Sequence, residues 1–463
     1  MIFKRNIFRI ICLMLMTVFN SYADLHLEVT EIDAGVDHDW VYATDGDVYL
    51  ELPGDADIDV TVDLDIGAGV TVYFTGDFSL IIDDGVTIDA DGATFTSDAV
   101  IPEAGDWGSI ELSGAIGNYA TGEFTNCIFE YGGDEDGGND HPHGPISITN
   151  QNYGDVSVDN CELRHCLGTA IGSSDGSHDS RISVTNCLIW HCENGITLRV
   201  LEDLDEDYYH EIRNNILVGF DEFGENVEQY GYGIWIDQEA PDVWIENNII
   251  AECANDGIRC MTLEYIVNNT IANVGGSGIY FTDNDEDYVF DPNADVRNNI
   301  IYAFGGDAGI HKDEEIDPFT VNYNYVYDTS NPSYSQGVTG TNHRPEAAPY
   351  LPIFALDKWS STFPDPNDID YHLAFYSECV HNGDPAIENE NTTDSDLGGY
   401  GGGDADPYFL AITGSIVDQL TIDADQMDDD LCDYHLVGTC DISPTGGLTI
   451  EPDGEDLTIY AHD

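Results

Sequence analysis

The chain has 463 residues, of which 90 are acidic and 12 basic, and its formal net charge is −78 at pH 7. So negative a surface repels phosphate backbones, which argues against nucleic acid as a partner. It is typical of a protein kept soluble in high salt or of one that takes up divalent cations. We favour salt adaptation, because lysine is nearly absent and the acidic residues are spread along the chain.

Residues 1–23 have the pattern of a secretory signal peptide. Lys4, Arg5 and Arg9 precede an apolar run, and Ser21–Tyr22–Ala23 supplies small residues at a cleavage site. The apolar run is short for a membrane span, and we expect no transmembrane segment in the mature chain. The sequence therefore predicts an exported protein, secreted or held at the cell surface. After the signal, 90 acidic residues face nine basic ones, a net charge of −81.

Residues 24–57 are polar, acidic and rich in turn residues, as expected of an N-terminal cap. From Ile58 to Ser97, apolar residues alternate with polar ones, and Gly/Asp turns separate the runs. This period-two alternation predicts short strands and no helix. Trp107 to Leu112 is expected to form a further strand.

Between residues 122 and 327 two landmarks repeat. An asparagine recurs every 21 to 34 residues, at Asn126, Asn160, Asn186, Asn214, Asn247, Asn268, Asn298 and Asn324. After most of them a Gly or Ala precedes an isoleucine, at Ile171, Ile196, Ile234, Ile258, Ile279 and Ile310. Paired landmarks with a loose period predict stacked coils with variable loops. Because no helical periodicity is present, the coils must be strands and bends, and the predicted fold is an all-β, right-handed parallel β-helix.

We expect each asparagine to occupy a left-handed bend and to exchange amide hydrogen bonds with the asparagines of neighbouring coils. Six cysteines fall in two columns, Cys127, Cys161 and Cys187 directly after the asparagine and Cys166, Cys192 and Cys253 six residues after it. Buried small hydrophobic residues are the favoured interpretation. Disulfides between adjacent coils stay open for an exported protein, whereas the lack of a CxxC pair argues against zinc.

These coils, with Trp107-Gly108-Ser109-Ile110, resemble right-handed parallel β-helix repeat proteins of the pectin-lyase-like superfamily. Residues 347–402 resemble the closing segment that many secreted bacterial β-helix proteins carry after their last coil, as in Asp396–Leu397–Gly398–Gly399–Tyr400. The resemblance implies fold and little chemistry. The expected division is a signal peptide (1–23), an N-terminal cap (24–57), the parallel β-helix (58–330), its closing segment (331–402), and a linker with a short β-rich tail (403–463). That tail is too brief for a stable domain and would suit a truncated chain.

Strand alternation places the residue after each inward isoleucine on the outer surface. This outward row comprises Gly172, Thr197, Trp235, Arg259, Tyr280 and His311, and the row two residues further on comprises Ser174, Arg199, Asp237, Met261, Thr282 and Asp313. Rings stack on sugar faces and arginine pairs with carboxylates or sulfates, so Trp235, Arg259, Tyr280 and His311 are the predicted substrate-binding residues for an acidic sugar chain. The alternative is a flat decorated sheet whose arginines pair with nearby acids.

The sequence leaves catalysis open. Arg199, Arg259, Asp237, His311 and Lys312 are the catalytic candidates, the basic residues as a lyase base and Asp237 as a cation ligand. The segment around Asp237 resembles a pectate-lyase WIDH motif, but Gln replaces His and the expected downstream arginine-rich motif is missing. Polygalacturonase motifs are absent too. An enzyme of this kind would be a polysaccharide lyase or a glycoside hydrolase.

Two long insertions, 131–143 and 218–232, leave the scaffold after the asparagine turn. The first carries Asp134, Asp136 and Asp140, which are the candidate metal ligands, for Ca²⁺, although no EF-hand spacing occurs. Nothing in the sequence requires a cofactor, and a solvated acidic loop is the simpler explanation.

A further column combines His165 and His191 with Tyr131 and Glu252. It could bind a metal or supply a base, but polar residues at a solvent-facing bend are the commoner cause.

The sequence as a whole thus predicts a secreted, acidic β-helix protein that binds an extracellular, acidic polysaccharide or cell-surface glycan, with cleavage undecided. The alternative is a non-catalytic structural or adhesive surface protein whose β-helix is a stiff rod.

Overall fold

The computed structural model describes most of residues 24–401 and, beyond them, only short strands. The residues left undescribed before 401 are 1–23, 29–30, 34–38, 42–45, 52–56, 116, 134–143, 149–153, 174–176, 179, 202–209, 221–230, 237–242, 262–264, 283–294, 315, 329, 343–353, 358–368, 374–376, 378, 381 and 388–395. Within the described part all regular structure is strand, and no helix there is long and apolar enough to cross a membrane.

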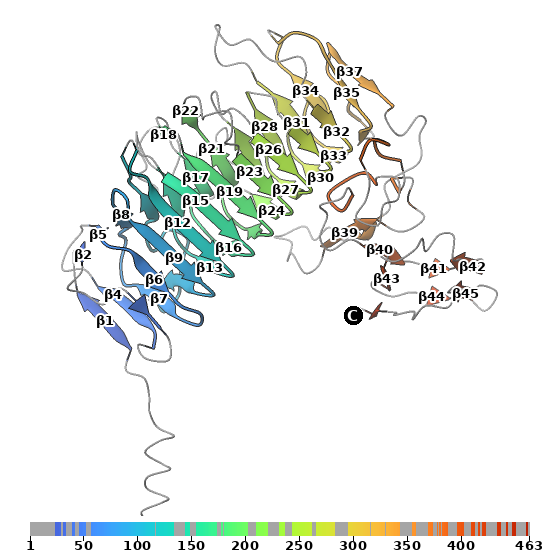
Figure 1. Ribbon diagram of the computed structural model, residues 1–463. Coiled ribbons are helices and arrows are strands. Elements are labelled where there is room, and N and C mark those ends of the chain that lie inside the picture. The colour runs from blue at the N-terminus through green and yellow to red at the C-terminus, as the bar shows by residue number, and fades with distance from the viewer. Residues whose placement is uncertain are drawn as a thin grey trace, which may run out of the picture.

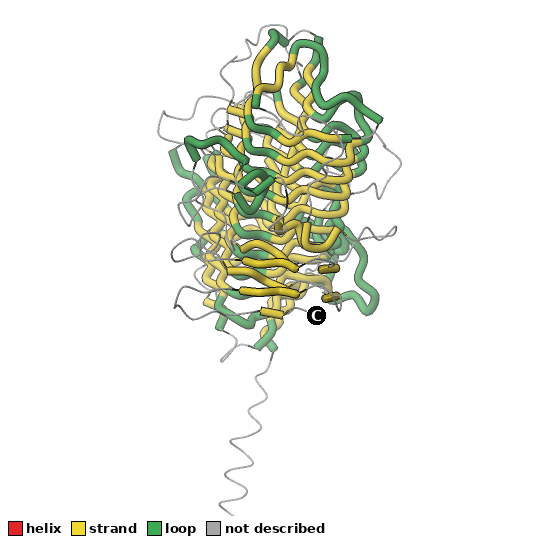
Figure 2. Tube along the Cα trace, turned by 90° about the vertical axis from the view of Figure 1, so that its right-hand side faces the viewer, coloured by secondary structure: helices red, strands yellow, loops and turns green. Residues whose placement is uncertain are grey.

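Three parallel sheets form the body, and the chain visits them in turn, adding one strand to each sheet per coil. Figure 1 shows the strands stacked from β1 to β37, and Figure 2 shows the coils edge-on. Short strands joined by bends and paired in parallel with the coils above and below define a parallel β-helix. The predicted all-β solenoid is confirmed.

The first sheet contains β1 (Leu25–Glu28), β4 (Val48–Glu51), β7 (Thr71–Phe74), β10 (Thr94–Ser97), β13 (Ile128–Glu130), β16 (Glu162–Arg164), β20 (Leu188–Trp190), β24 (Ile216–Phe220), β27 (Ile249–Cys253), β30 (Thr270–Val274), β33 (Ile300–Phe304) and β36 (Tyr325–Tyr327). The second contains β2 (Glu31–Ile32), β5 (Ile58–Val60), β8 (Leu80–Ile82), β11 (Ile110–Leu112), β14 (Ile146–Ile148), β17 (Thr169–Ser173), β21 (Asn194–Leu198), β25 (Ile234–Ile236), β28 (Ile258–Cys260), β31 (Ile279–Phe281) and β34 (Ile310–Lys312). The third contains β3 (Asp39–Trp40), β6 (Leu64–Ile66), β9 (Thr87–Asp91), β12 (Ala120–Thr125), β15 (Gly154–Asp159), β19 (Arg181–Thr185), β23 (His210–Arg213), β26 (Val243–Glu246), β29 (Tyr265–Val267), β32 (Asp295–Arg297), β35 (Phe319–Asn322) and β37 (Val338–Thr341).

The remaining strands form small separate sheets. They are the pairs β18 (Ser177–His178) with β22 (Val200–Leu201), β38 (Phe354–Asp357) with β39 (Ile369–Leu373), β41 (Ser415–Ile416) with β44 (Asp441–Ile442) and β42 (Gln419–Ile422) with β45 (Gly447–Ile450), and the triple β40 (Phe409–Ile412), β43 (Asp433–Leu436) and β46 (Tyr460–Ala461). Strands β1 to β4 already belong to the three large sheets, and β37 extends the third sheet beyond residue 330.

The core runs through the inside of the coils, because alternate residues of each strand point inward. Ile58 and Val60 are fully buried and flank an exposed Asp59, and the pattern repeats in later strands. Each such aliphatic side chain contributes about 1.5–3 kcal/mol when removed from water. Trp107 closes the core at one corner by stacking on Phe74 at a ring-centroid distance of 4.2 Å.

The repeated asparagine occupies a left-handed bend, as predicted. Asn126, Asn160, Asn186, Asn214, Asn247, Asn268 and Asn298 have φ between 51° and 58°. In the last coil, Tyr323 takes the bend with φ 52° and Asn324 is the residue after it. Asparagine tolerates this conformation better than other residues with a Cβ atom. The bend therefore sets the coil register.

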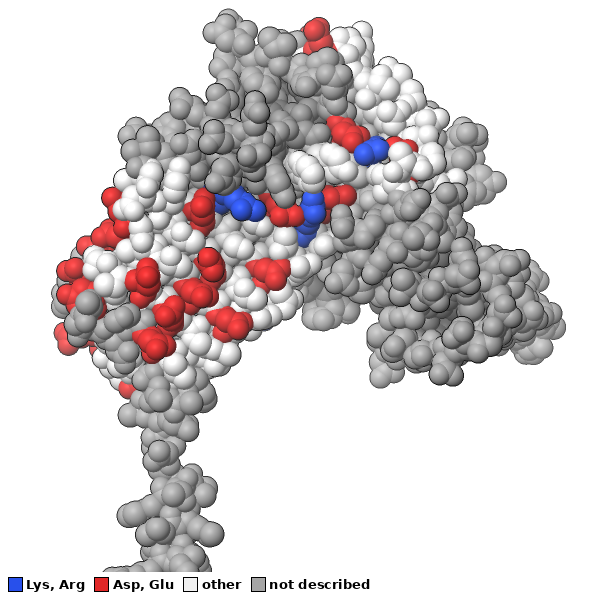
Figure 3. Space-filling view, viewed as in Figure 1, with Lys and Arg blue, Asp and Glu red and all other residues white. Residues whose placement is uncertain are grey.

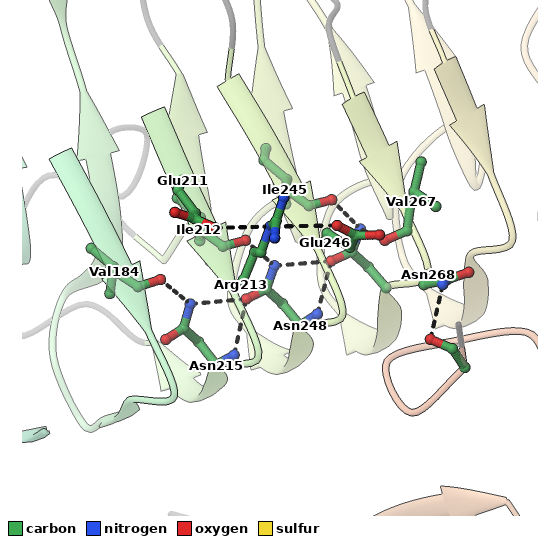
Figure 4. Close-up of polar contacts among 12 residues, drawn as sticks. Val184, Glu211, Ile212, Arg213, Asn215, Ile245, Glu246, Asn248, Val267 and Asn268 are labelled. Carbon is green, nitrogen blue, oxygen red and sulfur yellow. Dashed lines mark hydrogen bonds and ion pairs between the residues drawn. The ribbon is translucent and has the colours of Figure 1, made fainter. Parts of the chain in front are cut away.

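The amide ladder, in contrast, belongs mainly to the residue after the bend. Asn248 Nδ2 donates to Asn269 Oδ1 at 3.0 Å, and Asn215 Nδ2 donates to Asn248 Oδ1 at 3.0 Å (Figure 4). Asn299 continues the ladder to Asn324. The prediction assigned these bonds to the bend asparagines, but those side chains point outward, so the inward neighbour makes the ladder. Asn160 with Asn126, at 2.6 Å, is a bend pair that follows the prediction.

In the lower coils, cysteine occupies the same inward column. Cys187 N–H donates to Asn215 Oδ1 at 2.9 Å, and Cys127 N–H donates to Cys161 Sγ at 3.2 Å. The sulfur of Cys161 thus accepts a backbone N–H hydrogen bond of the kind that an asparagine Oδ1 accepts in later coils. All eight cysteines in the described residues are buried and free, which agrees with the favoured interpretation as small hydrophobic residues.

The closing segment packs against the outside of the first sheet. Tyr371, Leu373, Cys379, Val380 and Leu397 form a second apolar cluster with Val218, Ala251, Ala272, Ile300 and Tyr325 of the upper coils. The bend asparagines also hold the segment, since Asn298 Oδ1 accepts a bond from Asp384 N–H at 2.7 Å. Asn268 Nδ2, drawn in Figure 4, donates to Gly401 O at 2.8 Å.

Candidate functional site

The predicted outward row exists on the second sheet, in the predicted register. Gly172 pairs with Thr197 and Thr197 with Trp235. Above them Arg259 pairs with both Trp235 and Tyr280, and Tyr280 pairs with His311. Strand alternation alone is enough to place these six residues on one line.

Arg259 is surrounded by aromatic rings. Its Cζ lies 5.8 Å from the ring centroid of Trp235, 5.1 Å from that of Tyr280 and 5.5 Å from that of Tyr232. Arg259 Nη1 also donates to the Tyr232 hydroxyl at 2.9 Å. Each cation–π contact contributes about 0.5–2 kcal/mol. We call Tyr232, Trp235, Arg259, Tyr280 and His311 the Arg259 face.

Tyr232 was missed by the sequence analysis. It precedes Gly233 at a bend, where the simple alternation of inward and outward residues fails, and its ring lies 5.0 Å from that of Trp235. Tyr232 is 2% and Trp235 9% exposed, so these two rings form the buried part of the Arg259 face. Arg259, Tyr280 and His311 are half-buried and form the accessible part.

Arg259 differs from three of the other described arginines in how its charge is balanced. Arg164 pairs with Glu130 and Glu162, Arg213 with Glu211 and Glu246, and Arg297 with Asp295 and Asp384. Arg259 forms no ion pair with any residue that the structure describes, and Nε finds no hydrogen-bond acceptor among them. Among the described residues, the alternative of arginines paired with nearby acids thus applies to these three arginines and not to Arg259.

Asp256 is the carboxylate associated with Arg259. It is 6% exposed, and its Oδ1 accepts a bond from Ser277 N–H at 2.6 Å. Burial raises the pKa of Asp256 to about 6, while the Ser277 bond and the charge of Arg259 act in the opposite direction. Near neutral pH this side chain therefore exchanges between an acid and a carboxylate.

The upper end of the Arg259 face is fixed by Asp313. Tyr280 donates its hydroxyl hydrogen to Asp313 Oδ1 at 2.6 Å, and Thr282 Oγ1 donates to Oδ2 at 3.0 Å. The His311 ring meets Tyr280 edge-on at 4.8 Å. Burial and the bond to Asp313 raise the pKa of the Tyr280 phenol above its usual value, so the phenol stays protonated and is not available as a base.

The other catalytic candidates are placed as follows. Lys312 is buried, and its Nζ donates to the carbonyls of Asp313 at 2.9 Å and Ile316 at 2.7 Å. Its ammonium group is therefore engaged within the last coil. Arg199 is 8% exposed in the second outward row, and its N–H donates to Ser173 Oγ at 2.8 Å. Asp237 lies outside the described residues.

The metal candidates Asp134, Asp136 and Asp140 also lie outside the described residues. Within those residues, no group of three or more His, Cys, Asp or Glu side chains is arranged to hold a metal ion. The column of Tyr131, His165, His191 and Glu252 is a second line of left-handed bends, with φ between 52° and 65°. Its rings stack on one another, Tyr131 with His165 at 5.7 Å. This column thus has a structural explanation.

The surface charge is uneven. In Figure 3 acidic side chains gather over the N-terminal coils, whereas the few lysines and arginines lie over later coils. On the third sheet Asp39, Asp65, Asp89 and Glu123 stand in register, one per coil. The described basic residues after the signal-like segment thus begin at Arg164, and the coils beyond that point also carry the Arg259 face.

No family model matches the chain, and no curated protein matches it. Among solved structures the chain is similar to the Dettilon tailspike protein (gp208), with 10% identity and a TM-score of 0.20. The match covers 63% of this chain and 60% of the tailspike chain, so the chain spans less than two thirds of that protein. The class that the structure itself defines is an all-β parallel β-helix with an arginine held among aromatic rings on its second sheet.

Proposed function

We propose that the protein binds an acidic polysaccharide or cell-surface glycan through the Arg259 face. The observation that carries the proposal is the guanidinium of Arg259, placed among three rings and without an ion pair to a described residue. The chain has 90 acidic residues, yet none of those that the structure describes forms an ion pair with Arg259. A ligand carboxylate would supply the missing counter-charge.

The geometry favours a uronate over a neutral sugar. Nη1 is engaged by Tyr232 and Nε is buried, so Nη2 is the nitrogen of the guanidinium that remains to donate to a ligand carboxylate. The accessible rings of Tyr280 and His311 supply apolar surface beside the charge, as sugar faces require. The proposal includes an extracellular setting, from the signal-like residues 1–23, and membership of the pectin-lyase-like superfamily, from the repeated motifs.

Binding is proposed without a cleavage step. Lys312 is engaged by two carbonyls and the pKa of Tyr280 is raised, so neither described group is a suitable base. Asp237 and the Ca²⁺ candidates Asp134, Asp136 and Asp140 enter only as residues to test for activity.

The test is calorimetric binding to polygalacturonate and alginate, with their carboxyl-reduced forms as controls. We expect binding to the acidic polymers only, weakened about tenfold or more by Arg259→Gln. Arg181→Gln, an equal charge change at an exposed position on the third sheet, is the matched control. Equal binding of acidic and reduced polymers, or equal loss in both variants, would refute the proposal. New unsaturated or reducing ends, scored separately, would add catalysis.

A further inference from the structure

We propose that Asp313 is a positioning residue of the Arg259 face, acting on Arg259 through the ring of Tyr280; this inference rests on the proposed function. Asp313 lies in the second outward row and does not belong to the set of rings around the guanidinium. Its role is to fix the position of the Tyr280 ring, which is one of that set.

The contacts between neighbouring coils show how this works. Tyr280 pairs directly with His311, and Asp313 lies two residues further along the same coil. The Tyr280 hydroxyl nevertheless reaches Asp313 Oδ1 at 2.6 Å, so the phenol leans diagonally across the sheet. In this position its ring centroid is 5.1 Å from Arg259 Cζ.

Asp313 is itself held firmly. Its N–H donates to Phe281 O at 3.0 Å, its carbonyl accepts from Lys312 Nζ at 2.9 Å, and Oδ2 accepts from Thr282 at 3.0 Å. Lys312 thus contributes indirectly, by fixing the backbone that carries Asp313. A carboxylate anchored in this way can orient a ring that would otherwise rotate about its side-chain bonds.

The charge of Asp313 and its role in positioning Tyr280 predict opposite effects of its removal on uronate binding. A carboxylate close to an anion site opposes anion binding, so its removal should tighten the binding of a uronate if charge were its main effect. If its main effect is to hold Tyr280, its removal should weaken binding.

The first test needs no ligand. Arginine Nε–Hε resonances report ring currents, and we expect the Arg259 signal to move in the same direction in Asp313→Ala and Tyr280→Phe. Thr282→Val breaks the other bond of the same carboxylate without touching the ring, and it should leave that signal nearly in place. An Arg259 signal unchanged in Asp313→Ala would overturn the inference, whatever the protein binds. Unfolding midpoints establish that each variant is folded, and Asp313→Leu, which also lacks a hydrogen-bond acceptor, replaces Asp313→Ala if the latter is not.

The second test uses a uronate oligosaccharide. Asp313→Ala and Tyr280→Phe should each weaken binding about tenfold, and the double variant should be no weaker than either single variant. Tighter binding in Asp313→Ala, or additive losses, would overturn the inference while leaving uronate binding by the wild type intact. Absence of binding by the wild type would refute the proposed function instead, and the arginine resonances would still decide the role of Asp313.

Discussion

At the scale of single residues, one inward column explains both the asparagines and the cysteines. Asn248 Oδ1 accepts two hydrogen bonds from Asn215, one from its backbone N–H and one from its Nδ2. Asn248 Nδ2 in turn donates to Asn269 Oδ1 and to Ile212 O. Because these groups are all buried, each unmade bond costs about 1–3 kcal/mol. The column therefore stabilises the stack from within, whereas the neighbouring bend residues turn the chain and, in the upper coils, hold the closing segment.

The first prediction concerns this column. Asn248→Ala should lower the free energy of unfolding by about 3–5 kcal/mol, because it strands several buried donors and acceptors. Asn186→Gly, at an exposed left-handed bend, is the matched control and should cost much less, because glycine adopts that conformation easily. Denaturant unfolding measures both. Equal losses in the two variants would show that the ladder contributes no more than the bend.

Asp256 supplies a prediction about pH. Its pKa is raised to about 6, so its charge is absent below that pH and competes with a bound anion for Arg259 above it. Uronate affinity should therefore fall as pH rises from about 5 to about 7.5, while the ligand carboxylate stays ionised. Asp256→Asn should flatten the pH profile of the dissociation constant. A profile unaltered by this substitution would contradict the assignment.

At the scale of elements, the outward row on the first sheet changes character along the stack. Glu130 and Arg164 occupy it in the lower coils, and Val218, Ala251 and Ala272 occupy it above. The change occurs where the closing segment covers the sheet. Apolar outward residues on a regular coil are thus the sequence signal of a covered face.

The second sheet and its outward row could be predicted because alternation is a local rule. Tyr232 could not be predicted as part of the row, since it lies at a bend where alternation breaks. The docking of the closing segment could not be predicted either, because it depends on contacts such as Asn298 with Asp384, which are far apart in the sequence. The ladder was assigned one residue away from its true position because two adjacent asparagines share the motif. Local pattern fixes the coils, and tertiary contacts decide which coil surfaces stay accessible.

The closing segment gives a prediction at this scale. Ala251→Asp places a charge in the covered interface, at a cost of several kcal/mol, and should detach residues 371–401 without unfolding the coils. Hydrogen exchange should rise in that segment alone. Ser157→Asp, at an exposed outward position of the third sheet, is the control and should leave the segment protected. Exchange lost throughout the coils, or unchanged in the segment, would contradict this account.

At the scale of the whole molecule, repulsion between like charges destabilises the N-terminal coils in particular. Carboxylates facing one another across paired strands destabilise a sheet, and Asp39, Asp65, Asp89 and Glu123 do so in successive coils. Salt shortens the screening length from about 10 Å at 0.1 M to about 3 Å at 1 M. The acidic composition therefore fits a protein suited to high salt.

We accordingly expect 1 M NaCl to raise the melting temperature by a few degrees over 0.1 M NaCl. Asp65→Asn combined with Asp89→Asn should raise the low-salt melting temperature and reduce the increment due to salt. Calorimetry in the two salt concentrations measures both quantities. An increment unaffected by the double substitution would mean that the repulsion lies elsewhere on the molecule.

The central claim is that Arg259 binds a ligand carboxylate, and a structure with a bound uronate oligosaccharide tests it most directly. The account predicts one sugar carboxylate oxygen at about 2.7–2.9 Å from Nη2 of Arg259, with a sugar ring against Tyr280 or His311. A uronate bound on another face, with Arg259 still enclosed by its rings, would contradict the account.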